Sequence, residues 1–522
     1  MPAVDGVAEM HHLLLLGDQL TDQVGPLRRQ LDGSASFAEP LLLVETNDLR
    51  RAARHVQAAI LQLAALRAFA ADLRARGVAV EIVRGERLDE VLTAIGDRFH
   101  PNGITVMEPS QPQDLVTLRA WSTRGGTALD VVENELWLTT NGEWEAFKAG
   151  RKELRMEFWY RRVRGARGWL MEERDGRSEP IGGAWNLDKE NRKRLAAGTT
   201  VPAPPVPERS PIVQSTIDEI AALPHALFGD AAGFCWPTTR AAALEALEAF
   251  CRERLAGFGP YEDAMSREHE HLFHSLLSPA LNLGLITPRE VCERALATYA
   301  RRSVEIPLSS IEGFIRQILG WREFMHHAYR EFWQQWQTDN GLQAHENLPE
   351  FYWSGETKMA CMSRTVATLR RTGHVHHIER LMVLGNFALL FGVQPQQVDS
   401  WFLEAFVDAL PWVVTPNVVA MSQFADMGRI TSKPYIGGGA YISRMGDDCG
   451  SCAYDPGDST GPAACPFTTL YWEFIDRHAG TFAKNPRMAT QVRAWSARPA
   501  TKRREILARA DEVRRLVREG EL

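Results

Sequence analysis

The chain has 522 residues, of which 45% are hydrophobic and 24% charged, and its formal net charge is −7 at pH 7. A single core stops growing at about 250 to 300 residues, so we expect roughly two to four domains. The composition is that of an ordered globular protein, which argues against a disordered chain. The negative charge argues against a generally basic nucleic-acid coat, so any binding of DNA requires a local basic patch.

The N-terminal stretch MPAVDGVAEMHHLLLLGDQL contains one short apolar run without a basic flank. Such a segment predicts neither a secretory signal peptide nor a membrane span. We therefore expect a cytoplasmic protein without a membrane partner. Thiols stay reduced in that compartment, so clustered cysteines indicate a metal or redox site rather than a disulfide framework.

Short apolar runs alternate with helical patterns over the first 135 residues, at 12–16, 41–45, 78–83, 103–107 and 128–132. This alternation predicts an α/β domain over residues 1–140, with a Rossmann-like parallel sheet covered by helices. Parallel sheets bind ligands at the carboxyl ends of their strands, where GDQL (17–20) and Glu45 fall. Neither a GxGxxG nor a Walker sequence occurs there, so a general nucleotide-binding motif is absent.

A basic stretch follows at residues 147–167, FKAGRKELRMEFWYRRVRGAR, with eight lysines and arginines against two glutamates. Phe158, Trp159 and Tyr160 are interleaved with these charges. One interpretation is a surface for a phosphate backbone and stacked bases. The other is a solvated helix face whose aromatic side chains pack inward.

Residues 196–211 contain five prolines and little apolar periodicity, which predicts an extended connection. We therefore place an interdomain linker at residues 141–225. Beyond it, several segments have apolar residues at three- and four-residue spacing, among them SSIEGFIRQILGWREFMHHAYREFWQQW. The chain from 226 to 522 is thus predicted to be an all-α domain.

Three of the seven cysteines lie in DDCGSCAYDPGDSTGPAACPF, residues 447–467. A CxxC pair and a third cysteine followed by proline are compatible with an iron–sulfur cluster, with zinc, or with a reactive dithiol. The candidates for a fourth ligand are Cys235, Cys251, Cys292 and Cys361. Cys251 and Cys292 lie inside amphipathic helical patterns and are interpreted as small core residues. Cys361 follows the loop YWSGE and is better placed to face a site.

Four segments, HSLLSP, GFIRQILGWREF, HHIERLMVLGNFALL and SKPYIGGGAYI, together resemble the photolyase and cryptochrome family. The cysteines resemble those of its bacterial iron–sulfur branch, the prokaryotic (6-4) photolyases and related cryptochromes. The resemblance covers nearly the whole chain. It implies light-driven repair of (6-4) photoproducts in UV-damaged DNA by a lyase, with an electron from reduced FAD and a proton from histidine. A monomer is expected.

The resemblance also implies three cofactors: FAD in the helical domain, a 4Fe-4S cluster, and a 6,7-dimethyl-8-ribityllumazine antenna in the α/β domain. The implied cluster ligands are Cys361, Cys449, Cys452 and Cys465. The implied FAD contacts are Tyr261, His274, Ser275, Leu277, Ser278, Gln317, Arg322, Arg380, Asn417 and Asp426.

The remaining implied roles fall on seven side chains. His376 and His377 would face the lesion with Tyr435, Trp353 and Trp401 would carry electrons to the flavin, and Asp18 and Glu45 would hold the antenna. Histidine suits a proton transfer near neutral pH. As bare residues, the two histidines could instead make ordinary hydrogen bonds or form a zinc site with His374, and the two tryptophans could be core residues.

Three departures from the family pattern keep other functions open. Phe402 stands where many relatives carry tyrosine, Val414 where glutamate is common, and the antenna segment RHVQAAI lacks a histidine and lysines that relatives have. One alternative is a cryptochrome-type blue-light photoreceptor with little repair activity. Another is a light-independent iron–sulfur protein that binds nucleic acid.

Overall fold

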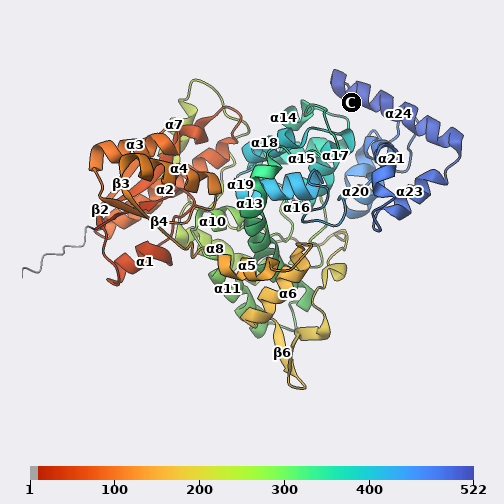
Figure 1. The fold of residues 1–522 in the computed structure, drawn as a ribbon. Helices are drawn as coiled ribbons and strands as arrows, with labels where there is room; N and C mark the ends of the chain where they lie inside the picture. The colour runs from red at the N-terminus through yellow and green to blue at the C-terminus, as the bar shows by residue number, and fades with distance from the viewer. Residues whose placement is uncertain (1–9) are drawn as a thin grey trace, which may run out of the picture.

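The computed structural model describes residues 10–522; residues 1–9, on which part of the N-terminal expectation rests, lie outside the described residues. In Figure 1 the α/β domain, coloured red to orange, lies beside a larger helical body coloured from green to blue. This arrangement confirms the predicted fold class, an α/β domain followed by a helical domain.

The sheet of the α/β domain has five parallel strands in the order β3-β2-β1-β4-β5. The strands are β1 His12–Leu15, β2 Ala38–Thr46, β3 Val80–Gly85, β4 Gly103–Met107 and β5 Ala128–Val132. Four of them are short apolar runs that are buried on one or both faces, as expected for a parallel sheet between helix layers.

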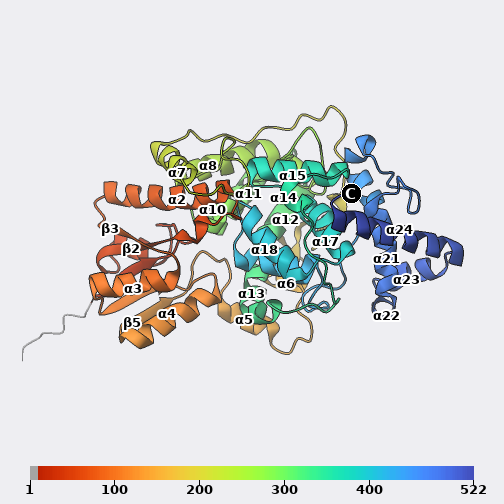
Figure 2. The ribbon, with the colours of Figure 1, turned by 90° about the horizontal axis from the view of Figure 1, so that it is seen from above.

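Helices cover both faces of this sheet (Figure 2). They are α1 Gly25–Leu31, α2 Val56–Ala75, α3 Leu88–Phe99 and α4 Pro112–Gly125. Along β1 and β2 the odd-numbered side chains pack with α2 and the even-numbered ones with α3 and α4, because successive strand residues point to opposite faces. Within residues 10–522, α2 is the one helix long and apolar enough to cross a bilayer, but 67% of its most apolar window is buried, so it is a core helix.

The interdomain segment 141–225 contains folded elements that pack on both domains. They are α5 Asn141–Lys148, α6 Met156–Arg167, the hairpin β6 Met171–Arg174 and β7 Arg177–Pro180, and α7 Pro211–Ala221. Trp144 of α5 stacks on His327 of the helical domain at 5.1 Å, and α7 packs on α2. The proline-rich connection before α7 is extended, as predicted.

The helical domain consists of short helices around two apolar cores. Its α-helices are α8 Arg240–Ala249, α9 Leu255–Phe258, α10 Ser278–Leu283, α11 Pro288–Arg301, α12 Leu308–Ile315, α13 Glu323–Trp336, α14 Phe351–Ser354, α15 Ala360–Thr372, α16 His377–Glu379, α17 Asn386–Phe391, α18 Pro395–Ala405, α19 Pro411–Thr415, α20 Gly439–Met445, α21 Pro466–Arg477, α22 Ala479–Phe482, α23 Ala489–Ser496 and α24 Ala500–Glu519.

Wider π-helical turns interrupt this pattern at η4 Phe250–Arg254, η5 Arg316–Arg322, η6 Arg380–Gly385 and η7 Pro416–Ser422. Three of these segments carry residues that the sequence analysis assigned to FAD: Gln317 and Arg322 on η5, Arg380 on η6 and Asn417 on η7. Such turns are rare and occur frequently at functional sites, because the extra residue redirects neighbouring side chains.

Candidate active site

Three histidine side chains meet in the helical domain. His376 and His377 lie at the start of α16, and His274 comes from the loop before α10. The rings of His274 and His376 stack with centroids 4.6 Å apart and an angle of 13°, while His377 lies edge-on to His274 at 5.5 Å. The structure thus brings together three residues that the sequence analysis assigned to the flavin and the lesion. We call this group the histidine pocket.

The ligand nitrogens of these histidines lie within 4.8 Å of one another, but their orientation is poor for a shared metal ion. In-plane lone pairs of two stacked rings run along nearly parallel lines and do not converge. His374, the third member of the zinc alternative, is not part of this group. The geometry therefore favours hydrogen-bonding or proton-transfer roles.

His376 and His377 differ in exposure and in charge preference. The side chain of His376 is 2% exposed and that of His377 is 47% exposed. Burial lowers the pKa of His376 well below its usual value. Burial alone would also lower the pKa of His377, but Asp263, 3.7 Å from Nε2, and the charge of Glu262 outweigh it and raise the pKa above 6.5. His377 is therefore the accessible imidazole of the pair, and it binds a proton more readily than His376.

Buried polar side chains surround His377 on the protein side. Gln317 donates a hydrogen bond to Glu262 at 2.5 Å, and Asn191 donates another at 3.2 Å. Burial raises the pKa of Glu262. Gln317 is thus joined to the histidine pocket through a carboxylate that sequence reasoning missed.

Tyr435 is influenced by a charge that also lies near His377. Burial raises its pKa, and the charges of Asp188, Arg487 and Arg192 also act on it. Arg192 lies 3.9 Å from Asp263, the partner of His377. Arg192 therefore lies near the partner of His377 and also acts on Tyr435.

Arg380 and Ser278 meet at Asp408. The Arg380 guanidinium contacts both oxygens of Asp408 at 3.0 and 3.2 Å, and the Ser278 hydroxyl donates to the same carboxylate at 2.6 Å. Burial alone would raise the pKa of Asp408, but Arg380 lowers it to about 2. Sequence reasoning missed Asp408, although an acidic residue inside the apolar run AFVDALPW was a usable signal.

The other predicted FAD residues are less closely joined. Arg322 pairs with Glu323 at 2.8 Å and lies over Trp137 at 4.0 Å. Asn417 donates to the Val413 carbonyl, and Asp426 accepts from backbone amides of its own loop. Over residues 10–522, these contacts do not connect Arg322, Asn417 or Asp426 to the histidine pocket. Tyr261 stacks on Phe273 at 5.3 Å, the Ser275 hydroxyl accepts from the Leu277 amide, and Leu277 is 1% exposed.

The two predicted electron-transfer tryptophans are neighbours. Trp401 is buried, and its ring centroid lies 6.3 Å from that of the partly exposed Trp353. On its other side Trp401 lies 5.8 Å from Phe406, whose ring is covered by the Arg380 guanidinium at 4.3 Å. Aromatic rings therefore run from Arg380 towards the surface. Phe402 is buried and stacks on Phe406 at 5.1 Å.

Cys361, Cys449, Cys452 and Cys465 line one small cavity with Gly439 and other side chains. All four are free thiols, whereas Cys251 and Cys292 are buried in the larger core, as interpreted from their helices. Four cysteine thiols around one cavity can bind a metal centre, either a zinc ion or an iron–sulfur cluster.

One arginine connects this cysteine cavity to the histidine pocket. Arg364 lies one turn after Cys361 on α15 and contacts Asp448, next to Cys449, at 2.8 and 3.0 Å. It also contacts Glu379 at 2.7 Å, and the other oxygen of Glu379 lies 3.4 Å from Nε2 of His376. We call Asp448, Arg364 and Glu379 the Arg364 bridge. Sequence reasoning missed it because its members belong to no local motif.

The two predicted antenna residues make different contacts. Glu45 is 1% exposed, and its carboxylate accepts from Arg50, Arg67 and Arg84 at 3.0 to 3.3 Å. Asp18 accepts from the Ser110 hydroxyl, and burial raises its pKa. Asp18 follows the end of β1, and Glu45 is the last residue but one of the neighbouring strand β2. Three arginine hydrogen bonds end on Oε1 of Glu45 and one on Oε2.

Solved structures of photolyases and cryptochromes have the same fold. A bacterial class III photolyase from Agrobacterium tumefaciens aligns over its whole length with 99% of this chain, with a TM-score of 0.57 and 15% sequence identity. A Synechocystis cryptochrome aligns over 98% of the chain with a TM-score of 0.58 and 15% identity. The family described as deoxyribodipyrimidine photo-lyase-related protein matches residues 13–236.

A relative with a higher sequence identity shows to which part of the photolyase and cryptochrome class the chain belongs. The chain is 36% identical to a protein named (6-4) photolyase from Agrobacterium fabrum over 506 residues, which cover 95% of this chain and 98% of the relative. An uncharacterized mimivirus protein is 44% identical over 70 residues, or 13% of this chain and 53% of that protein. The chain therefore belongs to the photolyase and cryptochrome family, in the branch of the Agrobacterium (6-4) photolyase. FAD is the cofactor common to this family.

Proposed function

We propose that this protein is a DNA photolyase that binds UV-damaged DNA and repairs (6-4) photoproducts on illumination. The observation that carries the proposal is His377, an exposed imidazole whose pKa is raised by Asp263, next to the buried His376. A flipped lesion entering this pocket would meet a proton donor. The high identity to a protein named (6-4) photolyase supports the same conclusion.

The residues of the helical domain fit a large polar cofactor. Buried polar atoms without a protein partner include Nε2 of His274, both ring nitrogens of His376, Nε of Arg322 and Oδ1 of Asn191. Each such atom costs about 1–3 kcal/mol when it is left unpaired, so the group calls for a ligand with matching donors and acceptors. We infer that FAD is held by His274, Gln317, Arg380 and Ser278. Reduced FAD, when bound and excited by light, would supply an electron to the two linked pyrimidines of the lesion.

The protein's own residues complete the reaction by proton transfer and positioning. His377 donates its proton to the oxygen that returns to its original base, and Asp263 holds the imidazole in its charged form. His376, neutral and buried, supports the ring of His274 by stacking. Tyr435 closes the side of the pocket next to Arg192.

We infer that the cysteine cavity holds a 4Fe-4S cluster with Cys361, Cys449, Cys452 and Cys465 as ligands. Four thiolates are the usual ligand set of such clusters, and the four cysteines line one cavity. The lumazine antenna, the monomeric state and the cytoplasmic location stay predictions. The contacts of Glu45 do not support an antenna contact at that side chain.

The test is repair of a defined oligonucleotide. A duplex with one (6-4) photoproduct is mixed with reduced protein and illuminated, and restored thymines are counted by chromatography, with a cyclobutane dimer as the second substrate. Repair of the (6-4) lesion alone supports the proposal. If the protein binds flavin but repairs neither lesion, the photoreceptor alternative is favoured. Phe402 and Val414, which depart from the family pattern, are consistent with that alternative. No flavin after denaturation favours the light-independent alternative.

Replacing Trp401 by Phe is expected to slow light-driven reduction of oxidised flavin at least tenfold, because Trp401 is the ring between Arg380 and Trp353. Repair by chemically reduced protein should stay unchanged. The measurement is flavin absorbance during blue illumination with an external reductant. The matched control is Trp472→Phe, since Trp472 stacks on Trp495 away from this path. Equal rates in wild type and the Trp401 variant would remove Trp401 from the electron path.

A further inference from the structure

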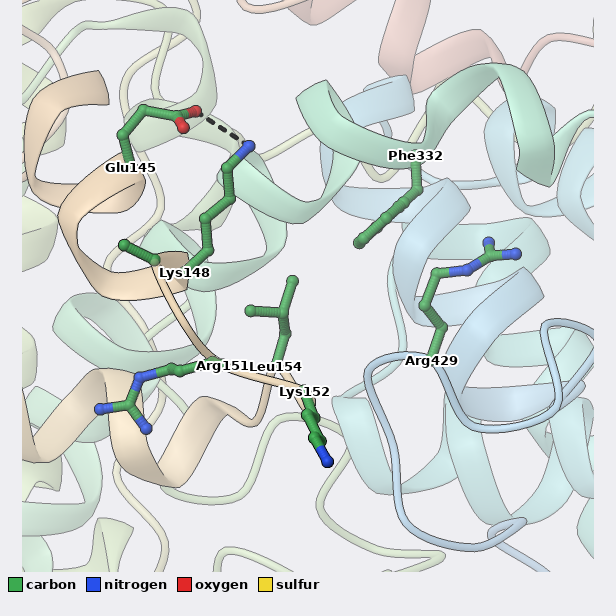
Figure 3. Close-up of a pocket in the computed structure, with 8 residues that line it drawn as sticks. Glu145, Lys148, Arg151, Lys152, Leu154, Phe332 and Arg429 are labelled. Atoms are coloured by element: carbon green, nitrogen blue, oxygen red, sulfur yellow. Dashed lines mark ion pairs between the residues drawn. The ribbon is translucent and has the colours of Figure 1, made fainter.

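A basic cavity of about 440 Å³ opens between the α5–α6 connection, α13 and the loop around Arg429. Figure 3 shows Lys148, Arg151, Lys152 and Leu154 coming from one chain segment, while Phe332 and Arg429 come from the opposite side. The ring of Phe332 points towards that segment, and the guanidinium of Arg429 points away from it. Four cations and one carboxylate line the cavity. In a chain with net charge −7, such a local excess of positive charge is the feature that binding of an anion requires.

Two of these cations are free to bind a ligand. Lys148 pairs with Glu145 at 3.0 Å and with Glu331 at 2.6 Å, and Arg429 pairs with Asp339 at 2.9 Å. No acidic partner is found for Arg151 or Lys152 in the described structure. The Arg151 guanidinium lies over the ring of Phe147 at 4.6 Å, which leaves its hydrogen-bond donors available.

The two walls of the cavity are held together by the protein itself. Arg155 donates hydrogen bonds to the carbonyl oxygens of Gly428 at 3.2 Å and of Arg429 at 3.0 Å. The loop that carries Arg151 and Lys152 is therefore fixed to the loop that carries Arg429. A preformed site loses less conformational entropy on binding than a mobile one.

Both walls are connected to Tyr435, which the proposed function places beside the lesion. Arg429 lies six positions before Tyr435, so the two are at most about 20 Å apart along an extended chain. On the other wall, Glu157 of α6 accepts a hydrogen bond from Asn186 at 3.1 Å. Asn186 lies two positions before Asp188, and the charge of Asp188 raises the pKa of Tyr435. A span of about 20 Å corresponds to about six base pairs of B-form DNA.

The exposed surface beside the cavity suits the same partner. Phe158 is 46% exposed and lies 5.8 Å from the Arg151 guanidinium. Phe332 and Leu154 add apolar surface inside the cavity. A deoxyribose next to a phosphate group presents this combination of apolar and anionic surface.

We propose that this cavity binds a backbone phosphate of the damaged duplex, within about six base pairs of the lesion, through Arg151 and Lys152. The inference rests on the proposed function, since it places DNA over the histidine pocket. A phosphate contact of this kind fixes the register of the duplex and carries no sequence information, which suits an enzyme that must act in any sequence context.

The experiment compares wild type with the double variant Arg151→Ala/Lys152→Ala, both loaded with flavin. Binding of labelled 20-base-pair duplexes is measured by fluorescence anisotropy from 50 to 300 mM salt. Loss of two phosphate contacts should reduce the slope of log Kd against log salt by about 1 to 2 and weaken binding about tenfold, with and without the lesion. The repair rate at saturating DNA should not change.

Arg124→Ala is the matched control, because Arg124 is exposed on α4 of the α/β domain and does not line the cavity. In the described structure Arg124 forms no ion pair with an acidic side chain. A second control uses two duplexes with the lesion near one end or near the other. Only the duplex that extends over the cavity should distinguish wild type from the double variant.

An unchanged salt slope in the double variant, or an equal change in the Arg124 variant, would overturn the phosphate site while leaving repair intact. Absence of repair in wild type would instead overturn the proposed function. Flavin content and melting temperature, measured on every variant, should match wild type because the replaced side chains are exposed.

Discussion

Replacing His377 by Ala is expected to lower the single-turnover repair rate by about 10²- to 10⁴-fold, the usual contribution of a positioned general acid. Flavin binding should persist, because His377 is half exposed and His274 and His376 keep their stacking contact. The measurement is the fraction of the lesion that chemically reduced protein repairs after each light flash. His345→Ala, at an exposed position outside the pocket, is the control. Repair at the wild-type rate would contradict the assignment of His377 as proton donor.

The pH dependence of this step follows from the raised pKa of His377. The protonated imidazole is the active form, so the rate should be constant at low pH and fall as pH rises through a pKa above 6.5. Asp263→Asn removes the carboxylate that raises this pKa, so the fall should move to lower pH. At pH 6 the variant should approach wild type, and at pH 8 it should be slower. Identical profiles would show that Asp263 does not act through His377.

Much of the fold could be predicted because apolar patterns depend on near neighbours in the sequence. The strand runs at 12–16 and 103–107 and the long apolar helix after Arg54 all appear where the pattern places them. β2 is the instructive difference, since it begins at Ala38, three residues before its apolar run. Ala38 pairs with His12 through the backbone, and backbone pairing requires no apolar side chain.

The same limit applies to the candidate site, because residues in a local motif could be predicted and contacts between distant residues could not. The cysteines could be found from a local motif, but their connection to the histidines could not. Arg364 and Asp448 are 84 positions apart, and Arg380 and Asp408 are 28 apart. Each of these residues alone resembles an ordinary charged helix residue, so only the tertiary structure reveals the buried pairs.

The basic stretch 147–167 shows that both interpretations of one pattern can hold in part. Trp159 and Tyr160 are fully buried, as the packing interpretation predicts. Phe158, Arg151 and Lys152 are exposed, as a nucleic-acid surface requires. Helical periodicity separates Phe158 from Trp159 and Tyr160 on α6. Arg151 and Lys152 are exposed because they lie in the connection before this helix.

Replacing Arg364 by Met is expected to destabilise the helical domain by about 3–5 kcal/mol, which is the usual effect of removing one partner from a buried ion pair. Asp448 and Glu379 are each 2% exposed, so the variant would leave two carboxylates without a counter-charge. The measurement is the free energy of unfolding in urea, together with iron and flavin content per chain. Stability equal to wild type would contradict a structural role for the Arg364 bridge.

The triple variant Arg364→Met/Asp448→Asn/Glu379→Gln is the matched control, because it removes all three charges and keeps the shapes of the two acidic side chains. If the uncompensated charges cause the instability, the triple variant should recover most of the lost free energy. The single variants separate the two ends of the bridge: Asp448→Asn should reduce iron retention, and Glu379→Gln should alter the surroundings of His376. A coupling energy above about 0.5 kcal/mol between these two substitutions would mean that the cysteine loop and the histidine turn stabilise each other through Arg364.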